Sequence, residues 1–335
     1  MSYTIYDLAR DSGVSVATVS RVINKNGSVK EKTRNKILKL MQENNYTPNA
    51  YARGLNNISM KTIGVLISDI GNPFFAELVK SIDLVCQKNQ YKIILCSTEN
   101  NAEIERKEIE MLIQKQVEGF IVAGSRPIKD ENADFLIQVS QTYPIVMINS
   151  FIKGGNKLFS IMVDEKKASF EAYSQLLSRG HENIFFFGDL NWKTTVAKLS
   201  GLKESMEQFN RSFDKLHFID CPFSYSSGKD GIKLLIERKI PFPYTICCSS
   251  DMIAIGAMRE LLTLGIKIPE QVSLVGYSNT EISSLTTPSL TTIDQKMSKL
   301  GEKGANLFIE VLNGTYPINK KIYSEYEFLI RESTF

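Results

Sequence analysis

The stretch that decides the N-terminal fold is residues 13–24, which read Gly-Val-Ser-Val-Ala-Thr-Val-Ser-Arg-Val-Ile-Asn. Val19, Val22 and Ile23 follow the i, i+3, i+4 spacing that places apolar side chains on one side of a helix. Ser15 precedes this pattern and can cap the first turn. The stretch therefore predicts a short amphipathic helix over about residues 16–24.

Two further helical patterns flank this helix, at about residues 4–11 and 33–44. The first is separated from it by Ser12-Gly13-Val14, and Gly13 suits a tight turn. The third pattern would bury Ile37, Leu40 and Met41. A helix, a glycine-containing turn and a second helix form a helix-turn-helix, which predicts an all-α headpiece.

The outward face of the second helix is the surface that decides what this headpiece could bind. It would carry small side chains first and polar ones later, namely Val16, Ala17, Ser20, Arg21 and Asn24. Such a helix can approach base edges in a DNA major groove, where arginine reads guanine and small apolar groups contact thymine methyls. The alternative is that Arg21 contacts only phosphate or solvent.

Charge is distributed unevenly along the chain. Residues 1–60 contain nine Lys and Arg against four Asp and Glu, a net charge of +5, whereas the whole chain carries +3. The remaining residues therefore carry −2. A basic N-terminal segment is what a phosphate-binding surface requires.

The rest of the chain alternates between strand-like and helical patterns. Strands are expected at residues 63–68, 92–97, 119–123, 145–149, 184–188, 245–249 and 273–277. Helices are expected at 74–88, 104–115, 166–178, 251–264 and 297–312. This alternation indicates parallel sheets covered by helices on both faces, and the length favours two Rossmann-like subdomains with a ligand cleft at the strand ends.

Several function classes lack their sequence signals. We find no P-loop, GxGxxG, GxSxG or HExxH motif, so we expect neither an enzyme nor a bound cofactor. The two histidines are isolated and the five cysteines show no CxxC spacing, which predicts no metal site, buried free thiols and a structural His181. Neither a signal peptide nor a membrane-spanning apolar run is present, which predicts a cytoplasmic protein.

The residues 13–24 strongly resemble the headpiece signature of the LacI/GalR family of bacterial repressors, G-V-S-x-x-T-V-S-R-x-x-N. Family-like segments continue in the same order to the end of the chain. They read Tyr46-Thr-Pro-Asn-Ala-Tyr-Ala-Arg-Gly-Leu55, Lys61-Thr-Ile-Gly-Val-Leu66, Asn72-Pro-Phe-Phe-Ala-Glu77, Arg179-Gly-His181 and Pro288-Ser-Leu-Thr-Thr-Ile-Asp-Gln295. One local departure is Lys30, which stands where the family has a serine cap, so we expect the third helix to start later, capped by Thr33.

The resemblance implies a domain organisation and a DNA-binding set. Residues 1–47 would be the headpiece, 48–60 a hinge helix and linker, and 61–335 an effector-binding and dimerisation domain with a periplasmic-binding-protein-like fold. In the family a leucine at the position of Leu55 wedges into the minor groove, and such a wedge kinks DNA at a cost that new contacts repay; the alternative is an ordinary linker residue. The expected DNA-binding residues are Thr4, Tyr6, Ser15, Val16, Ala17, Thr18, Ser20, Arg21, Asn24, Asn49, Ala52 and Leu55.

The resemblance also implies an effector pocket in the core. Phe74 and Phe75 open a helix after the first strand; we expect Phe74 to be core and Phe75 to contact ligand. Trp192 is the single tryptophan and falls in a loop, which favours a ligand-facing ring. The expected effector-binding residues are Phe74, Phe75, Ser125, Arg126, Asn149, Trp192, Lys198, Phe223, Asp251, Ser278 and Gln295.

Two departures from the family bear on the effector's charge. The family's R-L-x-G reads Lys198-Leu-Ser-Gly201, and Ser278 replaces the aspartate of the family's G-[YF]-D-[DN]. A retained cation, a lost carboxylate and Arg126 after a strand end predict an acidic or phosphorylated sugar derivative as effector. The alternative is that Lys198 faces solvent and Ser278 only enlarges the pocket.

These observations favour a homodimeric repressor of carbohydrate-utilisation genes that binds a palindromic operator under control of a small-molecule effector. The alternative is a regulator controlled by a phosphoprotein co-repressor, docked near residues 74–88. An enzyme with a DNA-binding segment lacks a catalytic motif, and an exported solute-binding protein would need an export signal. Repression versus activation and dimer versus tetramer stay open, although no heptad tail follows the core.

Overall fold

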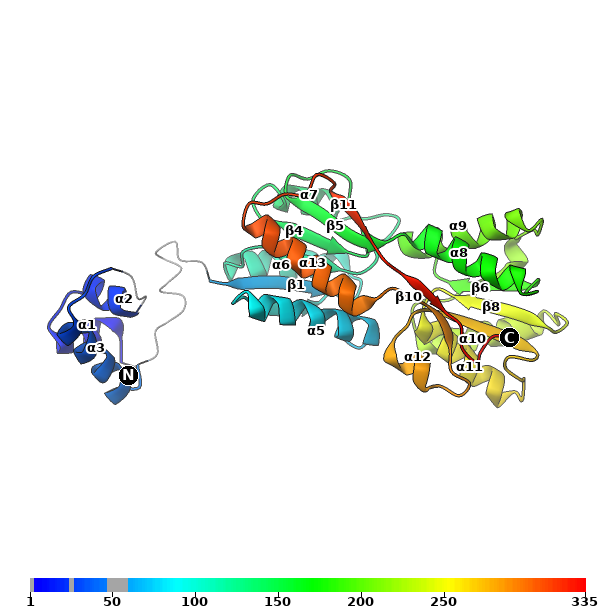
Figure 1. Cartoon of the computed structure of the whole chain (residues 1–335), viewed down its shortest axis with the longest axis horizontal. Coiled ribbons are helices and arrows are strands. Elements are labelled where there is room, and N and C mark those ends of the chain that lie inside the picture. Colours follow the sequence, from blue (N-terminus) through cyan, green and yellow to red (C-terminus); the bar gives the residue numbers. More distant parts are fainter. Residues whose placement is uncertain (1–2, 24–26, 47–59) are drawn as a thin grey trace. The chain divides into compact units, whose positions relative to one another are not determined.

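The computed structural model describes residues 3–23, 27–46 and 60–335 (Figure 1). The chain divides into two compact units, residues 1–60 and 61–335. The predicted DNA-binding residues Asn24, Asn49, Ala52 and Leu55, and nearly all of the predicted hinge, lie outside the described residues.

The first unit is a three-helix headpiece, as the sequence predicts. Its helices are α1 (Ile5–Ser12), α2 (Val16–Ile23) and α3 (Glu31–Glu43). They pack around buried Leu8, Ala9, Val19, Val22 and Ile37. The expected late start of α3 is wrong: the helix begins at Glu31, and its N-cap residue Lys30 makes no side-chain cap bond. The first-turn amides of α3 thus lack the side-chain acceptor that a serine would supply.

The second unit contains two six-stranded sheets. The first has the order β11-β5-β4-β3-β1-β2, and every neighbouring pair is parallel. Its strands are β1 (Thr62–Ile67), β2 (Lys92–Ser97), β3 (Phe120–Ala123), β4 (Ile145–Ile148), β5 (Leu158–Val163) and β11 (Lys321–Ser324). The first lobe is completed by the helices α5 (Pro73–Lys88), α6 (Ala102–Gln114), α7 (Ala133–Val139) and α13 (Met297–Leu312).

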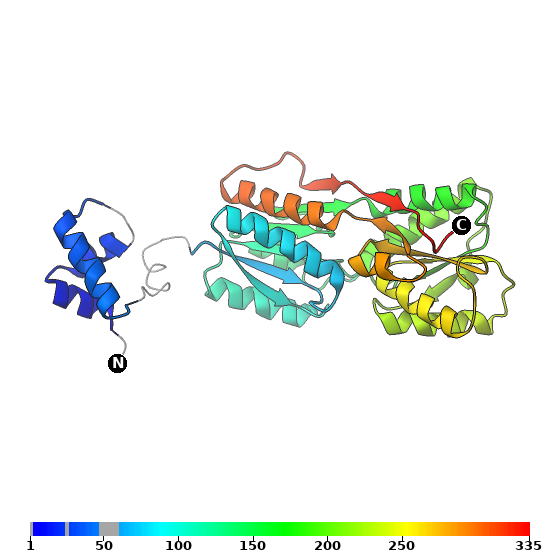
Figure 2. The same cartoon turned by 60° about the horizontal axis from the view of Figure 1, so that its bottom comes forward.

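Alternation along the strands explains why both faces of this sheet are covered. Val65 and Ile67 join the core beneath α5 and α13, whereas Leu66 faces the core beneath α6 and α7. Helices α5 and α13 lie side by side on one face (Figure 2). A parallel sheet buried on both faces needs such continuous apolar strands.

The second sheet has the order β12-β10-β9-β8-β6-β7, with only β12 antiparallel to its neighbour. Its strands are β6 (Ile184–Gly188), β7 (Phe218–Asp220), β8 (Tyr244–Cys248), β9 (Val272–Ser278), β10 (Thr291–Asp294) and β12 (Glu327–Leu329). Helices α8 (Glu165–Ser178) and α9 (Lys193–Gln208) share one core with the sheet, and α10 (Tyr225–Glu237) and α11 (Asp251–Thr263) share the other. Two short helices, η1 (Lys215–His217) and α12 (Glu281–Leu285), complete this lobe.

The chain crosses between the two lobes three times. It crosses from β5 to α8, from β10 to α13 and from β11 to β12, the last drawn in red in Figure 1. Because the crossings follow β5, β10 and β11 at their carboxyl ends, the same edge of each sheet faces the other lobe. This is the edge at which open α/β sheets bind ligands.

The predictions for cysteine and His181 agree with this fold. All five cysteines are buried free thiols, and burial raises the pKa of the Cys86 thiol to about 11. His181 is buried, stacks on Phe335, and has Nδ1 2.7 Å from the Thr245 hydroxyl. Its role is structural, as expected.

The contact between α10 and α11 yields a stability prediction. A Cβ on Gly256 would lie 1.9 Å from the Tyr225 carbonyl oxygen. We expect Gly256→Ala to lower the free energy of unfolding by about 1–3 kcal/mol through overpacking. Helix propensity alone predicts the opposite, a gain of about 1 kcal/mol. Urea unfolding followed by circular dichroism gives the sign, with Thr263→Ala at the exposed end of α11 as control.

Candidate functional site

The exposed face of α2 is the candidate nucleic-acid surface. Ala17 and Arg21 are exposed, whereas Val19 and Val22 are buried in the headpiece core. The expectation that Val16 faces fully outward is wrong: it is half-buried and packs against that core. The accessible surface of α2 is therefore narrower than predicted and centres on Ala17 and Arg21.

Two of the other described DNA-binding candidates cap helices. Thr4 caps α1, where its hydroxyl accepts from the Asp7 amide at 3.3 Å. Ser15 caps α2, where its Oγ accepts from the Thr18 amide at 3.2 Å and lies 3.0 Å from the Thr18 hydroxyl. Ser20 is half-buried, and Tyr6 is 73% exposed. Thr4 and Ser15 thus stabilise the first turns of α1 and α2, and both residues are exposed at the surface.

A cleft between the two lobes of the second unit is the candidate ligand site. Its lining comes from residues that directly follow strands of both sheets, such as Ser68 after β1 and Ser249 after β8. Ten of the eleven predicted effector residues line it: Phe74, Phe75, Ser125, Asn149, Trp192, Lys198, Phe223, Asp251, Ser278 and Gln295.

The two phenylalanines of the cleft have the reverse of the expected roles. Phe75 is 6% exposed and belongs to the core beneath α5, whereas Phe74 is only half-buried. Their rings meet edge to face with centroids 5.0 Å apart. Phe74 therefore offers more accessible ring surface to a ligand, and Phe75 mainly fixes the position of Phe74.

Trp192 forms an aromatic wall on the second lobe. Its indole Nε1 donates to Asp189 Oδ2 at 2.9 Å, which fixes the ring. Phe223 packs against it at 62°, with ring centroids 6.2 Å apart. Both residues are half-buried, so they present apolar surface at the cleft.

A chain of polar contacts forms the floor of the cleft. Ser278 Oγ donates to Gln295 Oε1 at 3.0 Å, and Gln295 Nε2 donates to Glu165 Oε1 at 2.9 Å. Glu165 Oε2 lies 3.8 Å from Lys198 Nζ. Burial raises the pKa of Glu165 and lowers that of Lys198, and each partner opposes the shift of the other. Lys198 is thus buried beside a carboxylate instead of facing solvent.

Asp251 is engaged by the protein on both of its oxygens. Oδ2 accepts from the Thr280 amide at 2.7 Å and the Thr280 hydroxyl at 2.9 Å, and Oδ1 accepts from the Thr292 hydroxyl at 2.7 Å. Burial raises the pKa of this carboxyl, and the hydrogen bonds lower it. Asp251 therefore joins α11 to the segments around β10 as well as lining the cleft.

Backbone strain marks three residues of the cleft other than glycine. Asn100 and Asn149 have φ 58° and Ser278 has φ 118°, all in the region that side chains other than glycine rarely adopt. Strain of this kind persists where surrounding structure enforces it, and it is common at binding sites. The turns after β4 and β9 are therefore held in fixed, ligand-facing conformations.

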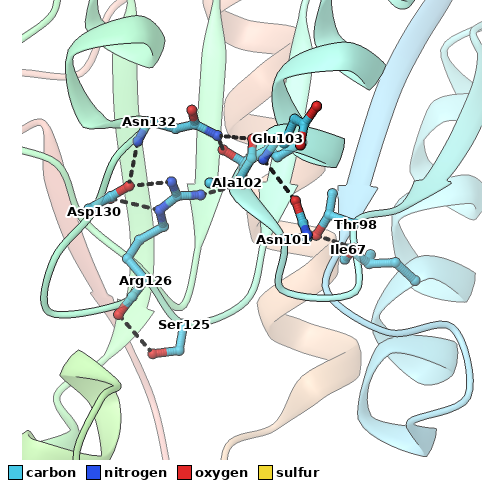
Figure 3. Close-up of polar contacts among 10 residues, drawn as sticks. Ile67, Thr98, Asn101, Ala102, Glu103, Ser125, Arg126, Asp130 and Asn132 are labelled. Carbon is cyan, nitrogen blue, oxygen red and sulfur yellow. Dashed lines mark hydrogen bonds and ion pairs between the residues drawn. The ribbon is translucent and has the colours of Figure 1, made fainter.

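Arg126 does not line this cleft, which corrects its predicted role. Its guanidinium bonds to Asp130 at 2.5 and 2.8 Å and to Glu105 at 2.5 Å, with all three side chains under 10% exposed. Figure 3 shows Arg126 against the Asp130 carboxylate, which also accepts from the Asn132 amide. A buried guanidinium needs such partners, and they leave it unable to serve as a free base for a ligand.

This ion triad (Glu105, Arg126 and Asp130) anchors a contact between the lobes. The inter-lobe contact joins residues 125–128 to residues 191–194. The Ile128 amide donates to the Asn191 carbonyl at 2.8 Å, and the Lys193 amide donates to the Arg126 carbonyl at 3.1 Å. Ser125 Oγ accepts from the Thr194 hydroxyl at 2.9 Å and from the Thr194 amide at 3.4 Å. Both segments also line the cleft, so the contact holds the lobes together beside it.

Sequence reasoning missed several polar residues that line the cleft, among them Asn100, Glu165 and Thr194. Asn100 and Glu165 follow the carboxyl ends of β2 and β5 within a few residues. The strand β5 was itself not predicted, so Glu165 gave no positional signal. Thr194 lies in the first turn of α9, a helix that was also not predicted.

The described residues contain no group of three or more His, Cys, Asp and Glu side chains that could hold a metal ion. Within residues 3–23, 27–46 and 60–335, no helix has the length and apolar character needed to cross a membrane.

Comparison with known families assigns both units. Residues 4–49 match the family described as bacterial regulatory proteins, lacI family. Residues 60–332 match the family described as periplasmic binding proteins and sugar binding domain of LacI family. Together the two matches cover nearly the whole chain.

Individual relatives match along their full length. The chain is 32% identical to the HTH-type transcriptional regulator DegA of Bacillus subtilis, covering 100% of this chain and 98% of that protein. It is 32% identical to catabolite control protein A of Priestia megaterium, covering 93% of each. The structure of the Lac repressor dimer bound to operator and the anti-inducer ONPF superposes with a TM-score of 0.87 at 24% identity, covering 100% of this chain and 99% of that one. The last likeness establishes the fold.

The ion triad yields a prediction about the second unit. We expect Arg126→Met to lower its free energy of unfolding by about 3–5 kcal/mol, because two carboxylates stay buried without a cation. The triple variant Glu105→Gln, Arg126→Met, Asp130→Asn should recover most of that loss. Urea unfolding monitored by Trp192 fluorescence measures both.

Lys107→Met is the matched control, since it breaks a pair with Glu103 on the same helix whose side chains are 68% and 75% exposed. It should cost at most about 1 kcal/mol. If Arg126→Met proves no less stable than Lys107→Met, the ion triad does not stabilise the second unit.

Proposed function

The chain belongs to the lacI family of bacterial regulatory proteins, and we propose that it represses carbohydrate-utilisation genes by binding a palindromic operator as a homodimer. A small molecule held in the cleft would set its affinity for the operator. The observation that carries this proposal is the presence, in one chain, of a helix α2 that exposes Arg21 and a separate polar and aromatic cleft between two lobes. DNA contact and ligand contact are thereby assigned to different units.

The support for the DNA-binding surface is chemical and electrostatic. Arg21 is exposed on α2 beside the small side chain of Ala17, which allows close approach to base edges. On α1, Asp7 and Asp11 both pair with Arg10 at 3.0 Å, so one of these two negative charges is offset locally. The net charge of +5 over residues 1–60 already counts both acids, and it favours contact with phosphate.

The support for a homodimer is an exposed apolar surface on the second unit. Leu84 of α5 is 51% exposed, and Ile282 and Leu285 of α12 are 38% and 71% exposed. Leu84 and Ile282 line one groove. Apolar patches of this kind are typical of subunit interfaces, and a two-fold dimer would present two headpieces to the two halves of a palindrome.

The support for a sugar-like effector is the lining of the cleft. Aromatic rings from Phe74, Trp192 and Phe223 face amide, hydroxyl and carboxylate groups, the combination that binds a ring with one apolar face and polar edges. The prediction of an acidic effector loses part of its basis, because it counted Arg126 and Lys198 as free bases. Both have carboxylate neighbours.

The test is a binding titration of the full-length protein on its own promoter region and on a random duplex across a salt series. We expect much tighter binding to the promoter and a steep loss of affinity as salt rises. Candidate sugars are then added to the promoter complex. Equal, weak binding to both duplexes would contradict direct operator recognition by the protein alone and favour the alternative, a required phosphoprotein co-repressor.

Arg21→Ala tests the recognition helix. Losing a bidentate contact to guanine should weaken specific binding by about 1–3 kcal/mol and relax sequence preference. Fluorescence anisotropy on promoter and random duplexes measures both effects, with Lys39→Ala on exposed α3 as the control for a lost positive charge. Equal losses on the two duplexes would reduce Arg21 to a phosphate contact.

A further inference from the structure

We propose that Glu165 sets the charge selectivity of the cleft: by neutralising Lys198 it excludes anionic ligands and favours an uncharged polyhydroxyl ligand. The inference deepens the proposed function and rests on the cleft being the effector site. Glu165 is the first residue of α8, directly after the first crossing between the lobes. It is 3% exposed and lines the cleft.

The two oxygens of Glu165 have different surroundings. Oε1 accepts from Gln295 Nε2 at 2.9 Å, which fixes the carboxylate. Oε2 lies 3.8 Å from Lys198 Nζ, beyond hydrogen-bond distance, and no described donor meets it in hydrogen-bond geometry, although the nearby Tyr277 hydroxyl lowers the pKa of Glu165. A buried carboxylate oxygen in this state is a strong acceptor for a ligand donor.

Lys198 is engaged on its other sides as well. Its Nζ donates to the Ser249 carbonyl at 3.0 Å and lies 3.8 Å from the centroid of the Tyr277 ring. These contacts and Glu165 together balance the ammonium without any ligand. An incoming anion would have to compete with a carboxylate that is already in place.

The charge of the whole lining points the same way. Of the described residues that line the cleft, three are acidic, Asp69, Glu165 and Asp251, and one is basic, Lys198. Moving an anion from water into such surroundings costs desolvation and gains no free cation. A hydroxyl group can instead donate to Glu165 Oε2 and accept from Lys198, and it brings no charge to desolvate.

This arrangement also accounts for the loss of a carboxylate at position 278. Ser278 bonds to Gln295, and Gln295 bonds to Glu165, so the polar chain continues from the serine to a carboxylate supplied by another segment. An aspartate at 278 would add a fourth acid to the lining beside Gln295.

The single tryptophan of the chain, Trp192, lines the cleft and supplies a direct readout of binding. We would titrate glucose, glucose 6-phosphate and inorganic phosphate into the wild type, Glu165→Gln and Glu204→Gln while following its fluorescence. Glu204 is the matched control, because it pairs with Lys166 on the surface with 51% of its side chain exposed. We expect the wild type and Glu204→Gln to give no saturable response to phosphate. Glu165→Gln should respond saturably and shift the preference toward glucose 6-phosphate at least tenfold.

The double variant Glu165→Gln, Lys198→Met should lose the response to phosphate again, since the anchoring cation is gone. Three outcomes would each overturn the proposal. The wild type could bind phosphate saturably, or it could prefer glucose 6-phosphate to glucose. A folded Glu165→Gln could also respond to phosphate as weakly as Glu204→Gln. If Glu165→Gln gives no cooperative thermal transition, the variant is not folded. The binding of glucose, glucose 6-phosphate and phosphate by the wild type then decides the proposal. Operator binding measured without any sugar tests the proposed function independently, so the two can fail separately.

Discussion

The parallel direction of the strands is the constraint on which the second unit depends. Because nearly all strands within each sheet run the same way, every turn that follows a strand emerges at the same edge. The chain crosses between the lobes at that edge, so the polar turns of both sheets meet across one cleft. Ser68, Ser125 and Asn149 come from the first sheet, and Ser249 and Ser278 come from the second.

The sequence predicted most strands and helices whose apolar pattern is continuous, although it missed the apolar strand β5, and it failed at several elements where burial is achieved by polar groups. Strand β10 contains Thr291 and Thr292, whose hydroxyls are buried because Thr334 and Asp251 bond to them. Helix α9 buries Thr194, Thr195, Lys198 and Ser205, which breaks the apolar stripe that defines an amphipathic helix. The partners that make such burial tolerable are distant in sequence, so a local pattern cannot reveal them.

The same limit explains the outcome at the candidate site. Ten of the eleven effector candidates line the cleft, because the family resemblance implied most of these positions and the end of the first strand indicated Phe74 and Phe75. The sequence did not reveal whether the charged side chains at these positions have oppositely charged partners, because those partners come from other elements. Arg126 meets Glu105 from α6, and Lys198 meets Glu165 from α8. The sequence alone suggests that Arg126 and Lys198 are free cations, but in the fold each of them lies beside a carboxylate.

The inter-lobe contact sets the energy scale on which a ligand could act. Its four hydrogen bonds would break if the lobes parted between residues 125–128 and 191–194. At about 0.5–1.5 kcal/mol each, they stabilise the joined arrangement by roughly 2–6 kcal/mol. A two-state equilibrium moves from 1:99 to 99:1 when a ligand favours one state by about 5.5 kcal/mol. A ligand that touches Ser125 and Trp192 in the cleft contacts both sides of the inter-lobe contact. Its preference for one lobe arrangement can therefore shift an equilibrium whose free-energy difference is comparable to that of these hydrogen bonds.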